Sequence, residues 1–152
     1  MSSSLSHGEV EISCDSDICY LDLIQEVSDK VGQLAGFDAD TLYWIGLSLR
    51  ESVTNAIQHG NKQDKSKKVE IRFQINSRRL VISVTDQGNG LSESQIPDPL
   101  NPENLLKAGG RGIFFVRSFM DKVTFDQNPG GGFTVRMEKR VNHKTKGEDN
   151  DD

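Results

Sequence analysis

The chain has 152 residues, of which 34% are hydrophobic and 27% charged, with a formal net charge of −5 at pH 7. This length and composition are typical of one globular domain that buries its own core. The acidic balance argues against binding to a nucleic-acid backbone, which requires a basic face. No run of about eighteen apolar residues predicts a membrane span, and the serine-rich start lacks the parts of a secretory signal.

The first half of the chain begins with a predicted strand at 10–14, where apolar and polar residues alternate. Asp15 or Ser16 is suited to cap the helix that follows, and Gly36 is suited to end it. Apolar residues recur in between at three- to four-residue steps, as in an amphipathic helix. The two cysteines have no histidine or further cysteine near them, so we expect reduced thiols in a cytoplasmic protein rather than a zinc site.

A second helix is predicted to begin after Asp38 or Asp40 and to run to about His59, where Gly60 ends it. One apolar stripe runs along it: Leu42, Ile45, Leu49, Val53 and Ala56. Residues 69–75 then alternate strictly between apolar and polar, which predicts a strand. A turn at 76–78 leads to a returning strand at 80–85.

The long segment 86–112 is rich in glycine and proline and is predicted to be a loop with one helical turn at 103–106. A helix at 112–121 and two strands at 122–126 and 133–139 close the domain. The order of elements predicts an α+β fold, a two-layer sandwich with a mixed, mostly antiparallel sheet and helices on one face. We expect one domain at 9–140, with flexible tails at 1–8 and 141–152.

Three polar residues of the second helix, Glu51, Asn55 and His59, recur every four residues and form one stripe. Such a stripe is often only a solvated helix face. Trp44 lies on the same side, however, and asparagine is a poor helix former in mid-helix. An asparagine one turn from a glutamate suits Mg²⁺, which takes a few protein oxygens and leaves the other positions to phosphates and waters.

The segment Asp86-Gln87-Gly88-Asn89-Gly90 follows a predicted strand directly. It is compatible with an ordinary turn, but its glycines also permit a flat ligand to approach the backbone closely. A buried Asp86 would accept a hydrogen bond from an amine such as that of adenine. An ionised aspartate only accepts, so it would reject the carbonyl of guanine.

A third segment, Gly109 to Gly112, opens a predicted helix. Free N–H groups at a helix N-terminus bind anions such as phosphate, although a flexible helix entry explains the glycines equally well. Arg111 adds a positive charge that could face either a ligand or a protein partner. The P-loop, the dinucleotide fingerprint and the protein-kinase signature are all absent from the sequence.

The order and spacing of three segments, ESVTNAIQHG, DQGNG and GGRG, resemble the N box and the two glycine boxes of the GHKL ATPase superfamily. The stretches IPDPLNPENLL and GGRGIFFVRSFMDKVTF resemble its small anti-sigma factor branch, the serine kinases of partner-switching pathways. The resemblance covers about residues 10–139. It implies the Bergerat α/β sandwich and the use of ATP with Mg²⁺.

The resemblance also implies a role for each motif residue. Asn55 would ligate Mg²⁺, and Glu51 would be the general base for the attacking hydroxyl. Asp86 would bind the adenine amine, assisted through water by Thr134. A glycine set and one arginine would contact the rest of the nucleotide: Gly88 and Gly90 along the base, and Gly110, Arg111 and Gly112 at the phosphates.

The implied activity is phosphorylation of a serine or threonine on a small STAS-type anti-anti-sigma protein. Members of this branch are commonly homodimers and also sequester a sigma factor. No dimerisation helix with a phosphate-accepting histidine precedes the ATP-binding motifs, which argues against a conventional sensor histidine kinase. Two alternatives stay open, a non-catalytic ATP-binding regulatory module and a signalling kinase that acts outside sigma-factor pathways.

Overall fold

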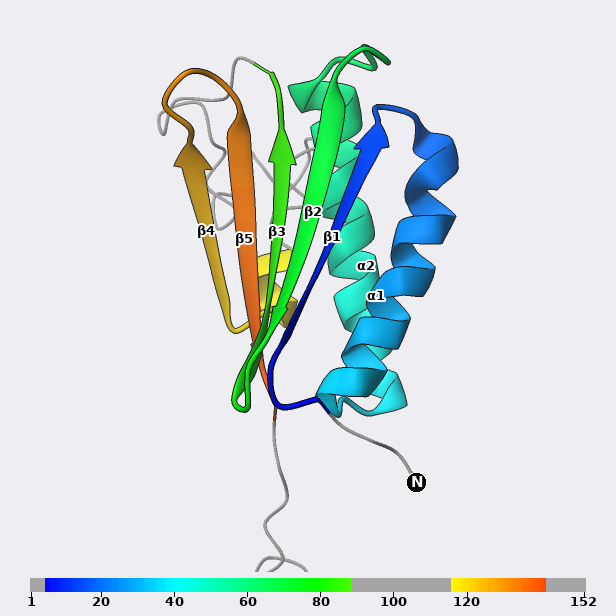
Figure 1. The fold of residues 1–152 in the computed structure, drawn as a ribbon, viewed down its shortest axis with the longest axis vertical. Coiled ribbons are helices and arrows are strands. Elements are labelled where there is room, and N and C mark those ends of the chain that lie inside the picture. Colours follow the sequence, from blue (N-terminus) through cyan, green and yellow to red (C-terminus); the bar gives the residue numbers. More distant parts are fainter. Residues whose placement is uncertain (1–4, 89–115, 142–152) are drawn as a thin grey trace, which may run out of the picture.

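The computed structural model describes residues 5–88 and 116–141, which form a sheet and a helical layer (Figure 1). The helical layer contains η1 (Ile18–Tyr20), a 3-10 turn, then α1 (Leu21–Ala35), α2 (Ala39–Asn55) and η2 (Ala56–Gly60), a π-helical turn. Residues 116–119 are also helical. The strands are β1 (Gly8–Asp15), β2 (Lys68–Ile75), β3 (Arg79–Asp86), β4 (Lys122–Gln127) and β5 (Phe133–Arg140).

The five strands lie in the order β1-β2-β3-β5-β4, and each neighbouring pair is antiparallel. Both long helices cover one face of this sheet (Figure 1). This arrangement confirms the predicted α+β sandwich with a mostly antiparallel sheet, and no parallel pair occurs among the described strands. Because β5 pairs with β3, the end of β3 lies beside the start of β5, with Asp86 opposite Phe133.

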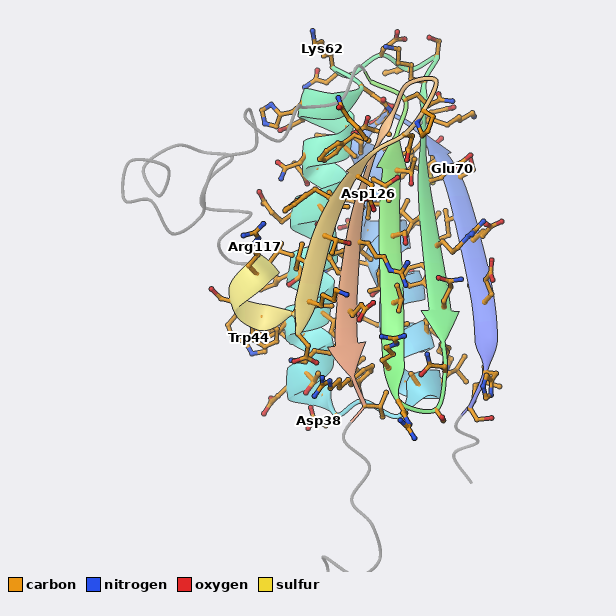
Figure 2. The ribbon with its side chains drawn as sticks, turned by 90° about the vertical axis from the view of Figure 1, so that its left-hand side faces the viewer. Asp38, Trp44, Lys62, Glu70, Arg117 and Asp126 are labelled. Atoms are coloured by element: carbon orange, nitrogen blue, oxygen red, sulfur yellow. The ribbon has the colours of Figure 1, made fainter. Side chains whose placement is uncertain are left out.

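Period-two alternation decides which face of the sheet is buried. In β2, Val69, Ile71 and Phe73 are 0% exposed, whereas Glu70 between them is exposed on the face away from α2 (Figure 2). The apolar stripe of α2 packs onto the buried face, because its residues recur at helical spacing. The most deeply buried residues of this stripe are Ile45, Leu49 and Val53.

The predicted helix boundaries need one correction. The sequence predicts that Asp15 or Ser16 caps the first helix, but α1 begins only at Leu21. Ser16 instead donates its hydroxyl proton to the carbonyl of Lys67 across the sheet, and Asp17 caps the intervening turn η1. The second helix begins as predicted, because Asp38 accepts a hydrogen bond from the backbone N–H of Thr41 at 2.8 Å.

In the C-terminal half, residues 116–119 confirm part of the helix predicted at 112–121, which ends two residues earlier than expected. The helical turn predicted at 103–106 and the tail from 142 onward lie outside the described residues. Cys14 is buried and Cys19 is exposed, and both thiols are free as expected. None of the helices within the described ranges is long and apolar enough to cross a membrane.

Asn61 joins the end of the helical layer to three strands. It follows η2 directly and is 0% exposed. Its side-chain amide donates to the hydroxyl of Ser16 at 2.8 Å and to the carbonyl of Lys68 at 3.0 Å. Its side-chain oxygen accepts from the backbone N–H of Gln87 at 2.7 Å. Asn61 therefore holds the ends of β1, β2 and β3 at one end of the sheet.

We expect Asn61→Ala to destabilise the fold strongly, because it removes three hydrogen bonds inside the protein. Each buried group left unpaired costs about 1–3 kcal/mol. Urea denaturation followed by circular dichroism measures the loss. Gln33→Ala, an exposed change on α1, is the matched control and should alter stability by less than about 0.5 kcal/mol. An Asn61→Ala protein as stable as this control would contradict the assigned role.

Candidate functional site

Asp86 is the last residue of β3 and is only 5% exposed. Among the described residues, Glu138 is the other buried acid, and its carboxylate pairs with Arg79 at 3.1 Å and with Arg136 at 3.6 Å. Asp86 forms no such ion pair within the described ranges. Its Oδ1 accepts a hydrogen bond from the backbone N–H of Gly88 at 2.9 Å. Asp86 is thus a buried acceptor that forms no ion pair among the described residues.

The electrostatic environment of Asp86 follows from this burial. Desolvation raises the pKa of its carboxyl above the ordinary value, because the charged form is poorly solvated there. Hydrogen bonds from the backbone of Gly88 and Phe133, and the positive charge of Lys67, act in the opposite direction. A ligand that donates a further hydrogen bond would stabilise the charged form, so an amine donor fits this position.

Three glycines near Asp86 lie so close to neighbouring atoms that a Cβ on any of them would clash. A Cβ on Gly60 would lie 2.1 Å from Oδ2 of Asp86, and one on Gly88 would lie 2.0 Å from the carbonyl oxygen of Gly60. At Gly132, a Cβ would lie 2.7 Å from the carbonyl oxygen of Asp86. The backbone N–H of Gly132 donates to the carbonyl of Gly88 at 2.9 Å. The end of the helical layer, the end of β3 and the β4–β5 turn therefore meet at this carboxylate.

The predicted polar stripe is present on α2 and η2. Glu51 is half-buried, and desolvation raises its pKa, whereas a hydrogen bond from the Asn55 side chain and the charge of His59 lower it. The three side chains are therefore electrostatic neighbours, as their four-residue spacing predicted. Desolvation therefore makes this carboxylate more basic than an exposed glutamate.

The stripe lies on the flank of α2 that carries Trp44. The ring of Trp44 stacks on Phe119, with ring centroids 4.8 Å apart, and Figure 2 shows Trp44 beside the short helix that carries Arg117. Val116, in this same helical stretch, is 4% exposed and belongs to the core. Gly88, the last described residue before residue 116, lies next to Asp86. Val116 and the helical residues after it therefore lie on the flank of α2 that carries Glu51 and Asn55.

The helix sets the separation between the two groups of site residues. Gly60 contacts Asp86 and lies five residues after Asn55 and nine after Glu51. At a rise of about 1.5 Å per residue, these intervals are roughly 7 and 13 Å along the axis. Asp86 and Glu51 therefore lie at opposite ends of an elongated site, with Asn55 between them. An extended ligand that presents an amine at one end fits this arrangement.

One predicted residue is not brought together with the others. The resemblance implies that Thr134 assists Asp86, but Thr134 is the cross-strand partner of Thr85, and Asp86 is the partner of Phe133. Because side chains alternate along a strand, Thr134 lies on the opposite face of the sheet from Asp86. Its hydroxyl lies 2.9 Å from that of Thr85 and accepts from the side-chain amide of Asn128 at 3.1 Å. The neighbouring Phe133 is the residue on the Asp86 face.

The described residues include no group of three or more histidine, cysteine, aspartate or glutamate side chains that could hold a metal ion. The amide oxygen of Asn55 is of a type that Mg²⁺ can take together with oxygens of a bound ligand and water. Four further predicted site residues lie outside the described residues: Gly90, Gly110, Arg111 and Gly112.

The sequence interpretation missed Gly60 and Asn61 as site residues. It includes Gly60 in the ESVTNAIQHG motif but gives it no role beyond ending the helix, and it places Asn61 in the segment that follows. A partial signal was available, because Gly60 and Asn61 are the two residues after His59 of the polar stripe. Their contacts with Asp86 and Gln87 join segments that are 26 residues apart in the chain, and no local pattern encodes such contacts.

Comparison with known proteins identifies the family of this chain. The family model for the histidine kinase-like ATPase domain matches residues 14–139. The chain is similar to the serine-protein kinase RsbW of Bacillus subtilis, with 29% identity over 147 residues, which cover 90% of this chain and 91% of that protein. It is 30% identical over 131 residues to RsbW of Bacillus licheniformis, covering 82% of this chain and 81% of that protein.

Solved structures share the fold at low identity. The RsbU and RsbW domains of a Mycobacterium tuberculosis protein superpose with a TM-score of 0.64 at 17% identity, covering 88% of this chain. This chain spans 32% of the length of that larger protein. The mycobacterial sensor histidine kinase MprB superposes with a TM-score of 0.55 at 15% identity, covering 88% of this chain and 97% of that one.

The raised pKa of Asp86 predicts how stability depends on pH. The folded protein holds the Asp86 proton more tightly than the unfolded chain does, so this proton favours folding at low pH. The contribution is lost as pH rises from about 3.9 through the raised pKa of the folded state. Asp86→Asn has no such titration. Its free energy of unfolding should therefore increase relative to that of the wild type as the pH rises over that interval. Urea denaturation at a series of pH values measures the difference, with the exposed Asp126→Asn as control. A pH-independent difference would contradict the burial argument.

Proposed function

The chain belongs to the histidine kinase-like ATPase domain family, and from this premise we propose that it is an ATP-dependent protein serine/threonine kinase that also acts as an anti-sigma factor. The observation that carries the catalytic part of this proposal is Glu51. This carboxylate is half-buried, has a raised pKa and lies one helical turn from Asn55. A domain that only bound nucleotide would have no need of a base there, and the RsbW relatives are named serine-protein kinases.

Asp86 recognises the base of ATP. Its buried carboxylate accepts a hydrogen bond from the exocyclic amine of adenine. The motif glycines Gly88 and Gly90 would line the base, and Gly88 also lets the backbone of Gly60 pack closely beside Asp86. Guanine presents a carbonyl at the equivalent position, and two acceptors facing each other in a buried site are unfavourable. Binding is therefore selective for ATP over GTP.

The other end of the nucleotide is bound from α2 and from the second glycine segment. Asn55 would hold Mg²⁺, which would supply positive charge to neutralise the phosphates. By the motif resemblance, Gly110 and Gly112 would allow the phosphates to approach backbone N–H groups closely, and Arg111 would add a positive charge. With the nucleotide positioned in this way, Glu51 takes the proton of the incoming serine or threonine hydroxyl as the oxygen attacks the terminal phosphorus. The bond from that phosphorus to the bridging oxygen breaks, and ADP leaves with the electron pair.

The protein substrate in this proposal is a small STAS-type anti-anti-sigma partner. Phosphorylation gives its serine or threonine a charge of about −1.5 to −2. That charge faces the phosphates of the bound nucleotide, so the modified partner is repelled and leaves. The kinase, as a homodimer, is then free to hold a sigma factor on the same surface. Arg111 and the loop 97–106 contribute to this surface, because they belong to the segment that joins the base-binding motif to the phosphate-binding one in the sequence.

Three substitutions separate nucleotide binding from chemistry. Asp86→Asn should weaken ATP binding by about 1.5–3 kcal/mol, because a charge-assisted hydrogen bond is lost. Asn55→Ala should lose the Mg²⁺-dependent part of ATP affinity. Glu51→Ala should retain most nucleotide binding but transfer phosphate about 10²–10⁴-fold more slowly. Calorimetry with ATP and GTP and a radiolabel transfer assay provide the readouts, with the exposed Glu26→Ala as control. Wild-type transfer by Glu51→Ala would favour the non-catalytic binding module.

The partner switch is tested by retention of a candidate STAS protein on the immobilised kinase in the presence of a non-hydrolysable ATP analogue, so that the STAS protein is not phosphorylated during the assay. We expect the unmodified STAS protein to be retained, and a version with its acceptor serine replaced by aspartate to be released, because of like-charge repulsion. Adding the sigma factor should displace the STAS protein. Equal retention of both forms, or simultaneous binding of STAS protein and sigma factor, would contradict the switch. If the kinase transfers phosphate to no STAS protein in the radiolabel assay, this would support a target outside sigma-factor pathways.

A further inference from the structure

We propose that Gly60 is a positioning residue for base recognition, because its missing side chain is what allows the carboxylate of Asp86 to keep its orientation. The nucleotide part of this inference rests on the proposed function, in which Asp86 binds adenine. The contact itself is a property of the fold. It joins the helix that carries Glu51 and Asn55 to the strand that carries Asp86, and it lies at the last residue of η2.

The space beside Gly60 is filled by the carboxylate of Asp86. A Cβ at position 60 would lie 2.1 Å from Oδ2, 2.4 Å from Cγ and 3.0 Å from Oδ1 of that residue. Real Cβ atoms do not approach other atoms so closely, so even an alanine must displace the carboxylate. The backbone of Gly60 does not itself require glycine, because the glycines with positive φ in the described ranges are Gly36 and the three of the 130–132 turn. The requirement therefore comes from the contact with Asp86.

Asp86 has little freedom to move aside without losing its other contacts. Its Oδ1 accepts from the N–H of Gly88, and its own carbonyl lies where a side chain on Gly132 would be. The next residue, Gln87, donates its N–H to the buried Asn61 at 2.7 Å. Rotation of the side chain is the movement that remains, and rotation would break the hydrogen bond with Gly88 and turn the free lone pairs away from a ligand.

The π-helical turn η2 explains how α2 reaches this carboxylate. The N–H of Asn61 donates to the carbonyl of Ala56, five residues earlier, at 2.8 Å. A turn of this kind contains one residue more than an α-helical turn, and such turns occur often at functional sites. It brings two consecutive residues to the end of β3, Gly60 against Asp86 and Asn61 against Gln87. The helix end therefore holds both the side chain and the backbone of the base-recognition segment.

This role predicts a loss of base selectivity rather than a general loss of nucleotide affinity. ATP donates from its exocyclic amine, whereas inosine triphosphate has a carbonyl at that position and is otherwise nearly identical. A carboxylate turned away by an added methyl group should lose the bond to the amine and no longer oppose the carbonyl. We expect Gly60→Ala to reduce the preference for ATP over inosine triphosphate about ten- to a hundred-fold. A purely structural defect would weaken both nucleotides equally.

The test combines calorimetry of the two nucleotides with a double-mutant cycle. Gly60→Ala and Asp86→Ala are made singly and together, and the urea midpoint of each protein is measured. Since Asp86→Ala removes the atoms that the new methyl group would strike, Gly60→Ala should lower the midpoint strongly in the wild-type background and only slightly in the Asp86→Ala background. Gly46→Ala is the matched control from the same helical layer, because its Cβ would meet mainly the flexible end of Gln25, at 3.1 Å.

The outcomes separate the inference from the proposed function. A wild type that does not prefer ATP over inosine triphosphate would contradict the base-recognition role of Asp86, while the midpoints would still decide whether Gly60 and Asp86 are coupled. Equal midpoint shifts in both backgrounds, or unchanged ATP preference in Gly60→Ala, would overturn the inference. If Gly60→Ala alone does not fold, the double variant should fold as well as Asp86→Ala does, and its failure to fold would overturn the inference too.

Discussion

The site depends on one contact, that of the end of the helical layer with the end of β3. Gly60 lies against the carboxylate of Asp86, and Asn61 accepts from Gln87 one residue further along. Asp86 and Asn61 are themselves buried, and a side chain on Gly60 or the loss of the Asn61 amide would disrupt packing or hydrogen bonding. Because α2 also carries Glu51 and Asn55, this contact sets the distance between the residue proposed to read the base and the residues proposed to act on the phosphates.

The carboxylate of Asp86 is energetically unfavourable in the interior, and the surrounding structure offsets its cost. A buried carboxylate that forms no ion pair among the described residues is unfavourable, and the raised pKa of Asp86 reflects that cost. Hydrogen bonds from Gly88 and Phe133 offset part of it. The rest is offset by the antiparallel sheet and its apolar face, where Val69, Ile71 and Phe73 are fully buried. An acceptor left partly unsatisfied in this way is prepared to bind a donor ligand.

Most of the architecture was predictable from local patterns. The strict alternation at 69–75, the apolar stripe of the second helix and the cap at Asp38 each encode an element that the structure confirms. The predicted start of α1 was wrong, because Ser16 bonds to Lys67, 51 residues away, and does not cap a helix. The predicted partner of Thr134 was wrong too, because the sequence does not show which face of β5 meets Asp86, and the register places Phe133 there.

The sequence by itself determined the types of chemistry available to this protein. The order of its three motifs indicated a nucleotide-binding domain of the GHKL type, and the spacing of Glu51, Asn55 and His59 put them on one stripe, because helical periodicity is a local property. Only the tertiary structure decided what surrounds Asp86. The closeness of Gly60, the burial of Asn61 and the choice of Phe133 over Thr134 depend on how a helix end, two strand ends and a turn pack together. Such contacts join residues far apart in the chain, so their geometry is set by the packing of the whole core rather than by any local pattern.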